Sequence, residues 1–137
     1  MTTLKLTAAT ARTTGFAAQA IANTASHLGD EINNATNKDL YLSLEALYQY
    51  ATAPTASKNV DFYILYAFDG TNYEEASAAR IIATLSPAAD TAAHRRVLVE
   101  SLLLLPFPFK LHVLNKDTEQ TITLTLDART HNEEAVS

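Results

Sequence analysis

Oxygen-bearing side chains gather most densely in residues 61–76, which read DFYILYAFDGTNYEEA. Asp69, Asn72, Glu74 and Glu75 carry the kinds of oxygen ligand that Ca²⁺ prefers, and the same groups could hydrogen-bond a sugar. Their spacing does not fit an EF-hand loop, which needs ligands at alternate positions and a closing Glu at the twelfth. Asp-Gly at the end of an apolar strand is typical of a hairpin turn, since Gly accepts a positive φ. We interpret the stretch as a turn between two strands, with a weak calcium or sugar contact as the alternative.

The residues that usually build catalytic or metal sites do not form a recognisable set. The spacing of the histidines matches no zinc motif, and without cysteine there is no thiolate ligand, disulfide or cysteine nucleophile. No serine lies in a Gly-x-Ser-x-Gly elbow, and three glycines cannot form a glycine-rich phosphate loop. Glu133 and Glu134 are more typical of a solvated tail than of an acid/base pair, which needs burial. We expect no catalytic residue, no metal and no cofactor, and hence no enzyme.

The overall charge and hydropathy exclude further classes of partner. A formal net charge of −5 repels phosphate, so nucleic acid is not an expected partner. No apolar stretch approaches the roughly 20 residues that span a bilayer, and the first residues lack the apolar core of a signal peptide. The absence of cysteine agrees with synthesis in a reducing cytoplasm. With 137 residues, the chain has the usual length of one domain.

Composition divides the chain into two zones. Residues 1–26 are dominated by Thr and Ala, and their large apolar side chains are few: Leu4, Leu6, Phe16 and Ile21. Such a segment buries too little apolar area to offset its ordering entropy, roughly 1–2 kcal/mol per residue for the backbone. It is therefore expected to be an N-terminal arm that becomes ordered on a partner, or else a frayed terminus. Residues 27–137 are expected to form the folded domain.

Residues 40–50, LYLSLEALYQY, show the alternation that a strand requires. The even-numbered positions, from Leu40 to Tyr50, are apolar or aromatic, and the odd-numbered ones are mostly polar, with Leu47 as the exception. A helix is the rival interpretation, because Leu40, Leu44 and Leu47 also fit a helical stripe. The tyrosine content and the turn-forming flanks favour the strand.

Five further segments read as strands. Residues 60–68 are apolar on both faces, which predicts a central strand. Shorter candidates follow at 79–86, 94–101, 109–115 and 120–128, separated by Asn, Asp, Pro, Ser and Thr clusters. In the last of them, Ile122, Leu124 and Leu126 alternate with threonines. Closely spaced strands of this kind predict an all-β fold: an antiparallel, jelly-roll-like β-sandwich with an extended N-terminal arm.

The four leucines at 102–105 have apolar side chains for both faces of a strand, whereas one face of a small sandwich usually meets water. Pro106 and Pro108 cannot donate to a strand ladder, so the stretch belongs at a sheet edge or corner. Either it crosses the edge of the core, or its second face packs on another chain. With the arm, this stretch supplies the expected partner-binding residues: Leu4, Leu6, Phe16, Ile21, Leu103, Leu105 and Phe107.

The order of turns and strands resembles small β-sandwich virion proteins of tailed bacteriophages, some of which are capsid decoration, or cement, proteins. The resemblance covers roughly residues 30–134 and lies in the order of the motifs. The matching segments are Ile32-Asn33-Asn34, Thr36-Asn37, Leu40, Thr52 to Ala56, Val60-Asp61 with Tyr63, Asp69 to Glu75, Arg95 to Val99, Leu105-Pro106 with Phe109-Lys110, and Arg129 with Asn132-Glu133.

This resemblance implies a mechanical role. A cement protein binds the outer capsid surface, bridges major capsid protein subunits and stabilises the head through repeated weak contacts. A homotrimer on the virion surface, made in the bacterial cytoplasm, is the implied assembly. The alternative is a phage tail or fibre adhesin that binds host glycan, with Tyr41, Tyr63 and Tyr73 as stacking faces and Asp69 and Asn72 as hydrogen-bonding groups. A non-viral β-sandwich interaction module is a third hypothesis.

Overall fold

The protein is almost entirely β-structure. The computed structural model describes residues 3–7, 9, 13–56, 58–76 and 80–136. Its elements are β1 (Thr3–Leu6), β2 (Thr13–Ile21), β3 (Ser26–Leu28), β4 (Ile32–Asn33), α1 (Asn34–Asn37), β5 (Tyr41–Tyr50), β6 (Val60–Tyr66), β7 (Arg80–Leu85), β8 (His94–Leu103), β9 (Pro108–Asn115), β10 (Ile122–His131) and β11 (Glu133–Val136).

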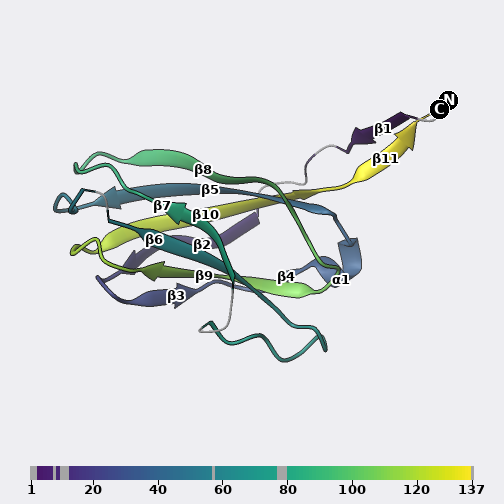
Figure 1. The fold of residues 1–137 in the computed structure, drawn as a ribbon, viewed down its shortest axis with the longest axis horizontal. Coiled ribbons are helices and arrows are strands. Elements are labelled where there is room, and N and C mark those ends of the chain that lie inside the picture. Colours follow the sequence, from purple (N-terminus) through teal and green to yellow (C-terminus); the bar gives the residue numbers. More distant parts are fainter. Residues whose placement is uncertain (1–2, 8, 10–12, 57, 77–79, 137) are drawn as a thin grey trace.

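Two antiparallel sheets pack face to face (Figure 1). One has the order β2-β10-β5-β8, and the other has the order β3-β9-β6-β7, with β4 also pairing with β9. Since β3 and β4 share this partner, they form one interrupted strand. In each sheet, strands from the earlier part of the sequence then alternate with strands from the later part, and this is the strand order of a jelly roll. The predicted fold class, an antiparallel β-sandwich, is confirmed.

The interruption between β3 and β4 is a β-bulge. Leu28 lies opposite His112 and Ile32 lies opposite Phe109, so that residues 29–31 face the two residues 110 and 111. The amide of Gly29 still donates to the Leu111 carbonyl at 2.8 Å, which keeps the strand attached to β9 through the bulge. A bulge of this kind bends the strand and allows it to follow a curved sheet.

The core lies between the sheets and follows the alternation of the sequence. In β5 every even-numbered residue from Leu42 to Tyr50 is buried, and in β10 Ile122, Leu124 and Leu126 are fully buried. β6 is a central strand, as its apolar character on both faces predicted. The remaining core side chains come mainly from β6 and β9: Val60, Phe62, Ile64, Tyr66, Phe109, Leu111 and Val113.

The expected arm of residues 1–26 is not a single unit. Thr13–Ile21 forms β2, an edge strand that pairs with β10, and Ser26–Leu28 forms β3. Phe16 and Ile21 are 8% and 2% exposed and belong to the core. The segment thus buries its few large side chains against the rest of the chain. Within the described residues before β2, the strand that stands away from the sandwich is β1, which pairs with the C-terminal β11 (Figure 1).

Among the residues that the structure describes, no helix has the length and apolar content that a membrane span requires.

Candidate interaction surface at one end of the sandwich

The β1–β11 ribbon projects from one end of the molecule, and Thr3 lies opposite Val136 at its tip (Figure 1). Leu4 lies opposite Ala135, and Leu6 lies opposite Glu133. Directly opposite residues share a face of a sheet, so one face of the ribbon carries Leu4, Leu6, Ala135 and Glu133. Leu4 and Leu6 are 67% and 57% exposed. The ribbon therefore presents two large apolar side chains to its surroundings.

The root of the ribbon is firmly attached to the sandwich. The Thr7 amide donates to the Asn132 carbonyl, and the Asn132 amide donates to Thr7 Oγ1, both at 2.8 Å. The Tyr41 hydroxyl donates to Glu133 Oε1 at 2.5 Å, and this bond raises the pKa of Tyr41. The Tyr41 ring also stacks on His131, at 5.1 Å between ring centroids. These contacts fix the direction in which the ribbon leaves the body.

The last residue of β8 and the segment that follows it add further apolar side chains at the same end. Leu103 lies opposite Tyr41, the residue to which the ribbon root is bonded, and is 66% exposed. Phe107 is half-buried and meets Phe68 edge to face, with 5.1 Å between ring centroids, although Phe68 itself is 81% exposed. We call this surface the apolar end. Its exposed residues are Leu4, Leu6, Leu40, Phe68, Leu103 and Leu105.

Buried polar groups hold the loops of the apolar end in place. The Asn34 side-chain amide donates to the carbonyls of Leu105 and Asp39, at 2.9 and 3.0 Å, and its oxygen accepts from the Asp39 amide. The Tyr66 hydroxyl accepts from the Leu105 amide at 3.2 Å. Asn34 and Tyr66 are both buried. The exposed leucines are therefore carried on a fixed framework, which lowers the entropy lost when a partner binds.

A groove of about 420 Å³ runs beside the apolar end, between the edge strands β7 and β8. Ile81, Ile82, Leu102, Leu103 and Leu105 contribute apolar surface to it. Arg80 is the charged residue among the described residues that line it. Ile64 and Tyr66 complete the lining from β6. The groove is an apolar trough with one positive charge.

The sequence-predicted partner-binding residues divide into three groups. Leu4, Leu6, Leu103 and Leu105 are exposed at the apolar end, and Phe107 is half-buried there. The expectation that Phe16 and Ile21 bind a partner is wrong, because both side chains are buried in the core and a partner cannot reach them. The sequence interpretation missed Phe68, which it included in the predicted strand at 60–68. The signal was present, since Phe68 directly precedes the Asp69-Gly70 turn and so lies beyond the end of the strand.

The Asp69 stretch is a turn, as interpreted from the sequence. Asp69 Oδ1 accepts from the amides of Thr71 and Asn72, at 2.9 and 2.7 Å, and Oδ2 accepts from the Asn72 side chain at 2.8 Å. These donors lower the pKa of Asp69 to about 2. Gly70 has a φ of +84°, the left-handed conformation that glycine adopts readily. The carboxylate is thus occupied by its own loop. The loop is longer than a tight hairpin, because β7 begins only at Arg80.

The tyrosines considered as sugar-stacking faces do not come together. Tyr41 lies in β5 of one sheet, and Tyr63 lies in β6 of the other. Tyr73 lies in the β6–β7 loop, where its hydroxyl donates to Glu31 and Lys110 Nζ sits 4.5 Å from its ring centroid. Among the described residues, no three His, Asp or Glu side chains form a group that could hold a metal ion.

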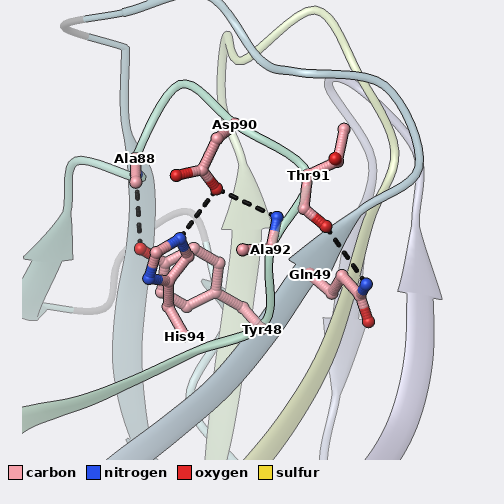
Figure 2. Close-up of polar contacts among 7 residues, drawn as sticks. All are labelled: Tyr48, Gln49, Ala88, Asp90, Thr91, Ala92 and His94. Atoms are coloured by element: carbon pink, nitrogen blue, oxygen red, sulfur yellow. Dashed lines mark hydrogen bonds and ion pairs between the residues drawn. The ribbon is translucent and has the colours of Figure 1, made fainter.

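The opposite end of the sandwich is polar and bonded within itself (Figure 2). Asp90 Oδ1 lies 2.8 Å from His94 Nε2 and accepts from the Ala92 amide at 3.0 Å, and the bond from His94 lowers the pKa of Asp90. The Tyr48 hydroxyl accepts from the Ala88 amide, and the Gln49 side chain donates to the Thr91 carbonyl. These bonds fasten the β7–β8 loop to the end of β5. Apolar surface available to a partner is therefore concentrated at the apolar end.

Comparison with known proteins gives a likeness of fold. No protein-family model matches the chain, and no curated protein does. Among the solved structures that match is a chain in the structure of infectious bursal disease virus, Gx strain, with a TM-score of 0.50 and 12% sequence identity. The match covers 94% of this chain and 32% of that chain, so this protein spans about a third of the length of its neighbour. At this identity the likeness concerns the fold alone: this chain has a fold similar to part of a chain in a virus structure.

Proposed function

We propose that this protein is a virion structural protein of a tailed bacteriophage, of the capsid decoration or cement type. It binds the outer surface of the head and bridges neighbouring major capsid protein subunits. It acts by binding and carries out no reaction, and it works as a homo-oligomer, with a trimer favoured. It is made in the cytoplasm of the host bacterium and ends on the virion surface.

The observation that carries this proposal is the projecting β1–β11 ribbon. An isolated two-stranded ribbon is at best marginally stable in water, and this one exposes Leu4 and Leu6 to solvent. Such an element gains its stability when its apolar face packs against another chain. A protein whose termini form a binding element, and whose body is a self-contained sandwich, is suited to linking other subunits.

Two further observations support a role in a virion. The jelly-roll strand order is common in viral capsid proteins, although it also occurs in lectins and cupins. The likeness in fold to a chain in a virus structure agrees with that role. The order of turn and strand motifs adds the phage and decoration part of the proposal, because it resembles the small β-sandwich virion proteins of tailed phages.

The proposal is tested by adding purified protein to capsids that lack it. We expect co-sedimentation and a higher temperature for heat-induced DNA release. The double variant Leu4→Ser/Leu6→Ser should attach more weakly, because it removes the apolar face of the ribbon. Leu28→Ser is the matched control: it removes an exposed leucine from β3, outside the apolar end. If the unmodified protein neither co-sediments nor shifts DNA release, the decoration role is overturned.

A further inference from the structure

The two long sides of the sandwich are built differently. On one side, β2 and the β3–β4 strand approach so closely that the Asp30 amide donates to the Gly15 carbonyl at 3.2 Å. On the other side, the edge strands β7 and β8 leave the groove of about 420 Å³ between them. Ile81 and Leu103 on its walls are more than half exposed, although both are large and apolar. This side of the sandwich lacks the cover that the other side has from its own chain.

The ribbon is complementary to the groove in apolar surface and in charge. Its apolar face offers Leu4 and Leu6, which are two residues apart on one strand and so about 7 Å apart along it. The same face ends in the carboxylate of Glu133. The groove offers apolar walls, and Arg80 is among its lining residues. The described part of the chain provides no ion-pair partner for Arg80. The two surfaces therefore match in polarity and are opposite in charge.

The ribbon of a given copy does not occupy its own groove. The bonds from Thr7 to Asn132 and from Tyr41 to Glu133 fix its root at the end of β10 and β5. From that root it leads away from the sandwich (Figure 1). The groove lies along the sandwich itself, between β7 and β8. A ribbon that enters the groove must come from another copy.

We propose that the β1–β11 ribbon of one copy packs Leu4 and Leu6 into the β7–β8 groove of a second copy, with Glu133 facing Arg80. This inference rests on the homo-oligomer part of the proposed function and names its contact. The contact joins two different surfaces, so it is heterologous, and it produces a closed ring when the rotation between copies closes. In a closed ring of three copies, each ribbon packs into the groove of the next copy, so that every ribbon and every groove is covered.

Site-directed crosslinking tests the contact directly, because the natural chain has no cysteine. A tagged Leu6→Cys variant is mixed with an untagged Leu103→Cys variant, and the mixture is oxidised after subunit exchange. We expect a disulfide-linked product that contains one chain of each kind. Leu28→Cys replaces Leu103→Cys in the control mixture, since Leu28 is exposed but lies on β3, away from the groove. The control should give little mixed product.

The other occupants of the groove give different products. A crosslink between two Leu6→Cys chains in preference to the mixed product indicates a ribbon-to-ribbon contact and overturns the proposal. A crosslink within a single chain that carries both substitutions indicates that the ribbon folds onto its own groove, with the same consequence. Equal mixed product from the Leu103→Cys and Leu28→Cys mixtures also contradicts it.

The charge match is tested by sedimentation velocity on purified protein over a range of concentrations. Arg80→Glu should raise the dissociation constant of the oligomer about tenfold, whereas Arg80→Lys should retain association. A wild-type protein that stays monomeric at all concentrations overturns this inference and leaves the capsid experiment to decide the decoration role. A stable oligomer that does not attach to capsids would support the contact between copies and would overturn the decoration role.

Discussion

Gly15 and Gly29 meet at backbone distance where β2 approaches the bulge between β3 and β4. A Cβ added to Gly29 would lie 3.0 Å from the Gly15 carbonyl oxygen and 3.3 Å from that of Leu111. Both neighbours are backbone atoms, so they cannot move aside as the tip of a side chain can. Glycine at position 29 therefore lets the edges of the two sheets come together on this side of the sandwich.

We expect Gly29→Ala to lower the free energy of unfolding by about 1–3 kcal/mol, as overpacking of a fixed site does. Urea denaturation followed by circular dichroism measures the change. The control is Gly70→Asn, at a position where a Cβ meets no atom within 4 Å and where Asn tolerates the positive φ. It should lower stability less than Gly29→Ala. Equal unfolding midpoints for Gly29→Ala and the wild type would show that the two backbones do not constrain each other.

Truncation of large side chains should lower the free energy of unfolding in the core but not in the ribbon. Phe16→Ala should cost about 3–5 kcal/mol and Ile21→Ala about 2–5 kcal/mol, because both side chains fill the core. Leu4→Ala and Leu6→Ala should leave the stability of the sandwich unchanged within about 0.5 kcal/mol, because both are exposed. Chemical denaturation of the four variants, at a protein concentration that keeps them monomeric, makes the comparison.

Deletions extend the same argument to whole segments. A chain that begins at residue 7 should keep the folded spectrum and unfold cooperatively, since β1 pairs with β11 outside the two packed sheets. A chain that begins at residue 27 loses β2 and exposes the side of β10 that β2 covers. We expect it to be unfolded or aggregated. A well-folded chain lacking residues 1–26 would contradict the assignment of β2 to the sandwich.

Asn115 is the centre of a buried polar network near the end of β9. Its side-chain amide donates to the carbonyls of Ile21 and Gln120, at 3.0 and 2.8 Å, and its oxygen accepts from the Thr118 hydroxyl at 2.5 Å. Asn115 and Thr118 are fully buried. The Thr118 hydroxyl also donates to the Gln120 carbonyl at 3.1 Å, so these two groups keep a partner in Asn115→Ala. The substitution removes the bond to the Ile21 carbonyl and should cost about 1–3 kcal/mol, as a buried polar group that loses its partner does. The more exposed Lys116→Ala is the neighbouring control and should be nearly neutral.

Asp69 should make stability depend on pH in the acid range. Its folded-state pKa of about 2 lies below its ordinary value of 3.8, because amide groups hydrogen-bond the carboxylate. The unfolded chain therefore takes up the proton more readily. The stabilising contribution is complete above pH 3.8 and is lost as the pH falls towards 2.

Calorimetry at several pH values between 4 and 2 measures this effect, since that interval spans the two pKa values. The unfolding temperature of Asp69→Asn should fall less steeply across the interval than that of the wild type. Glu75→Gln is the control, because Glu75 is an exposed acid in the same loop. Parallel curves for Asp69→Asn and the wild type would mean that the turn does not depend on the ionised carboxylate.

The sequence by itself determined the strands that obey a regular alternation. In β5 and β10 the positions of residues such as Leu42, Leu44, Ile122 and Leu124 assign one face to the core, because side chains alternate across a strand. Asp69-Gly70 likewise determined a turn from local chemistry, since Gly70 adopts a positive φ and Asp69 caps nearby amides. These features depend on residues close together in the chain, so a single sequence suffices to predict them.

Only the tertiary structure decided the role of residues 13–21. Phe16 and Ile21 are five residues apart, so a regular strand would point them to opposite faces. The register against β10 shifts between Leu124 and Leu126, and Ala18 there has a φ of +47°. This bulge turns both side chains into the core. Its position depends on pairing with a strand about a hundred residues away, which no local pattern contains, and the ribbon and the groove likewise exist only where distant strands meet.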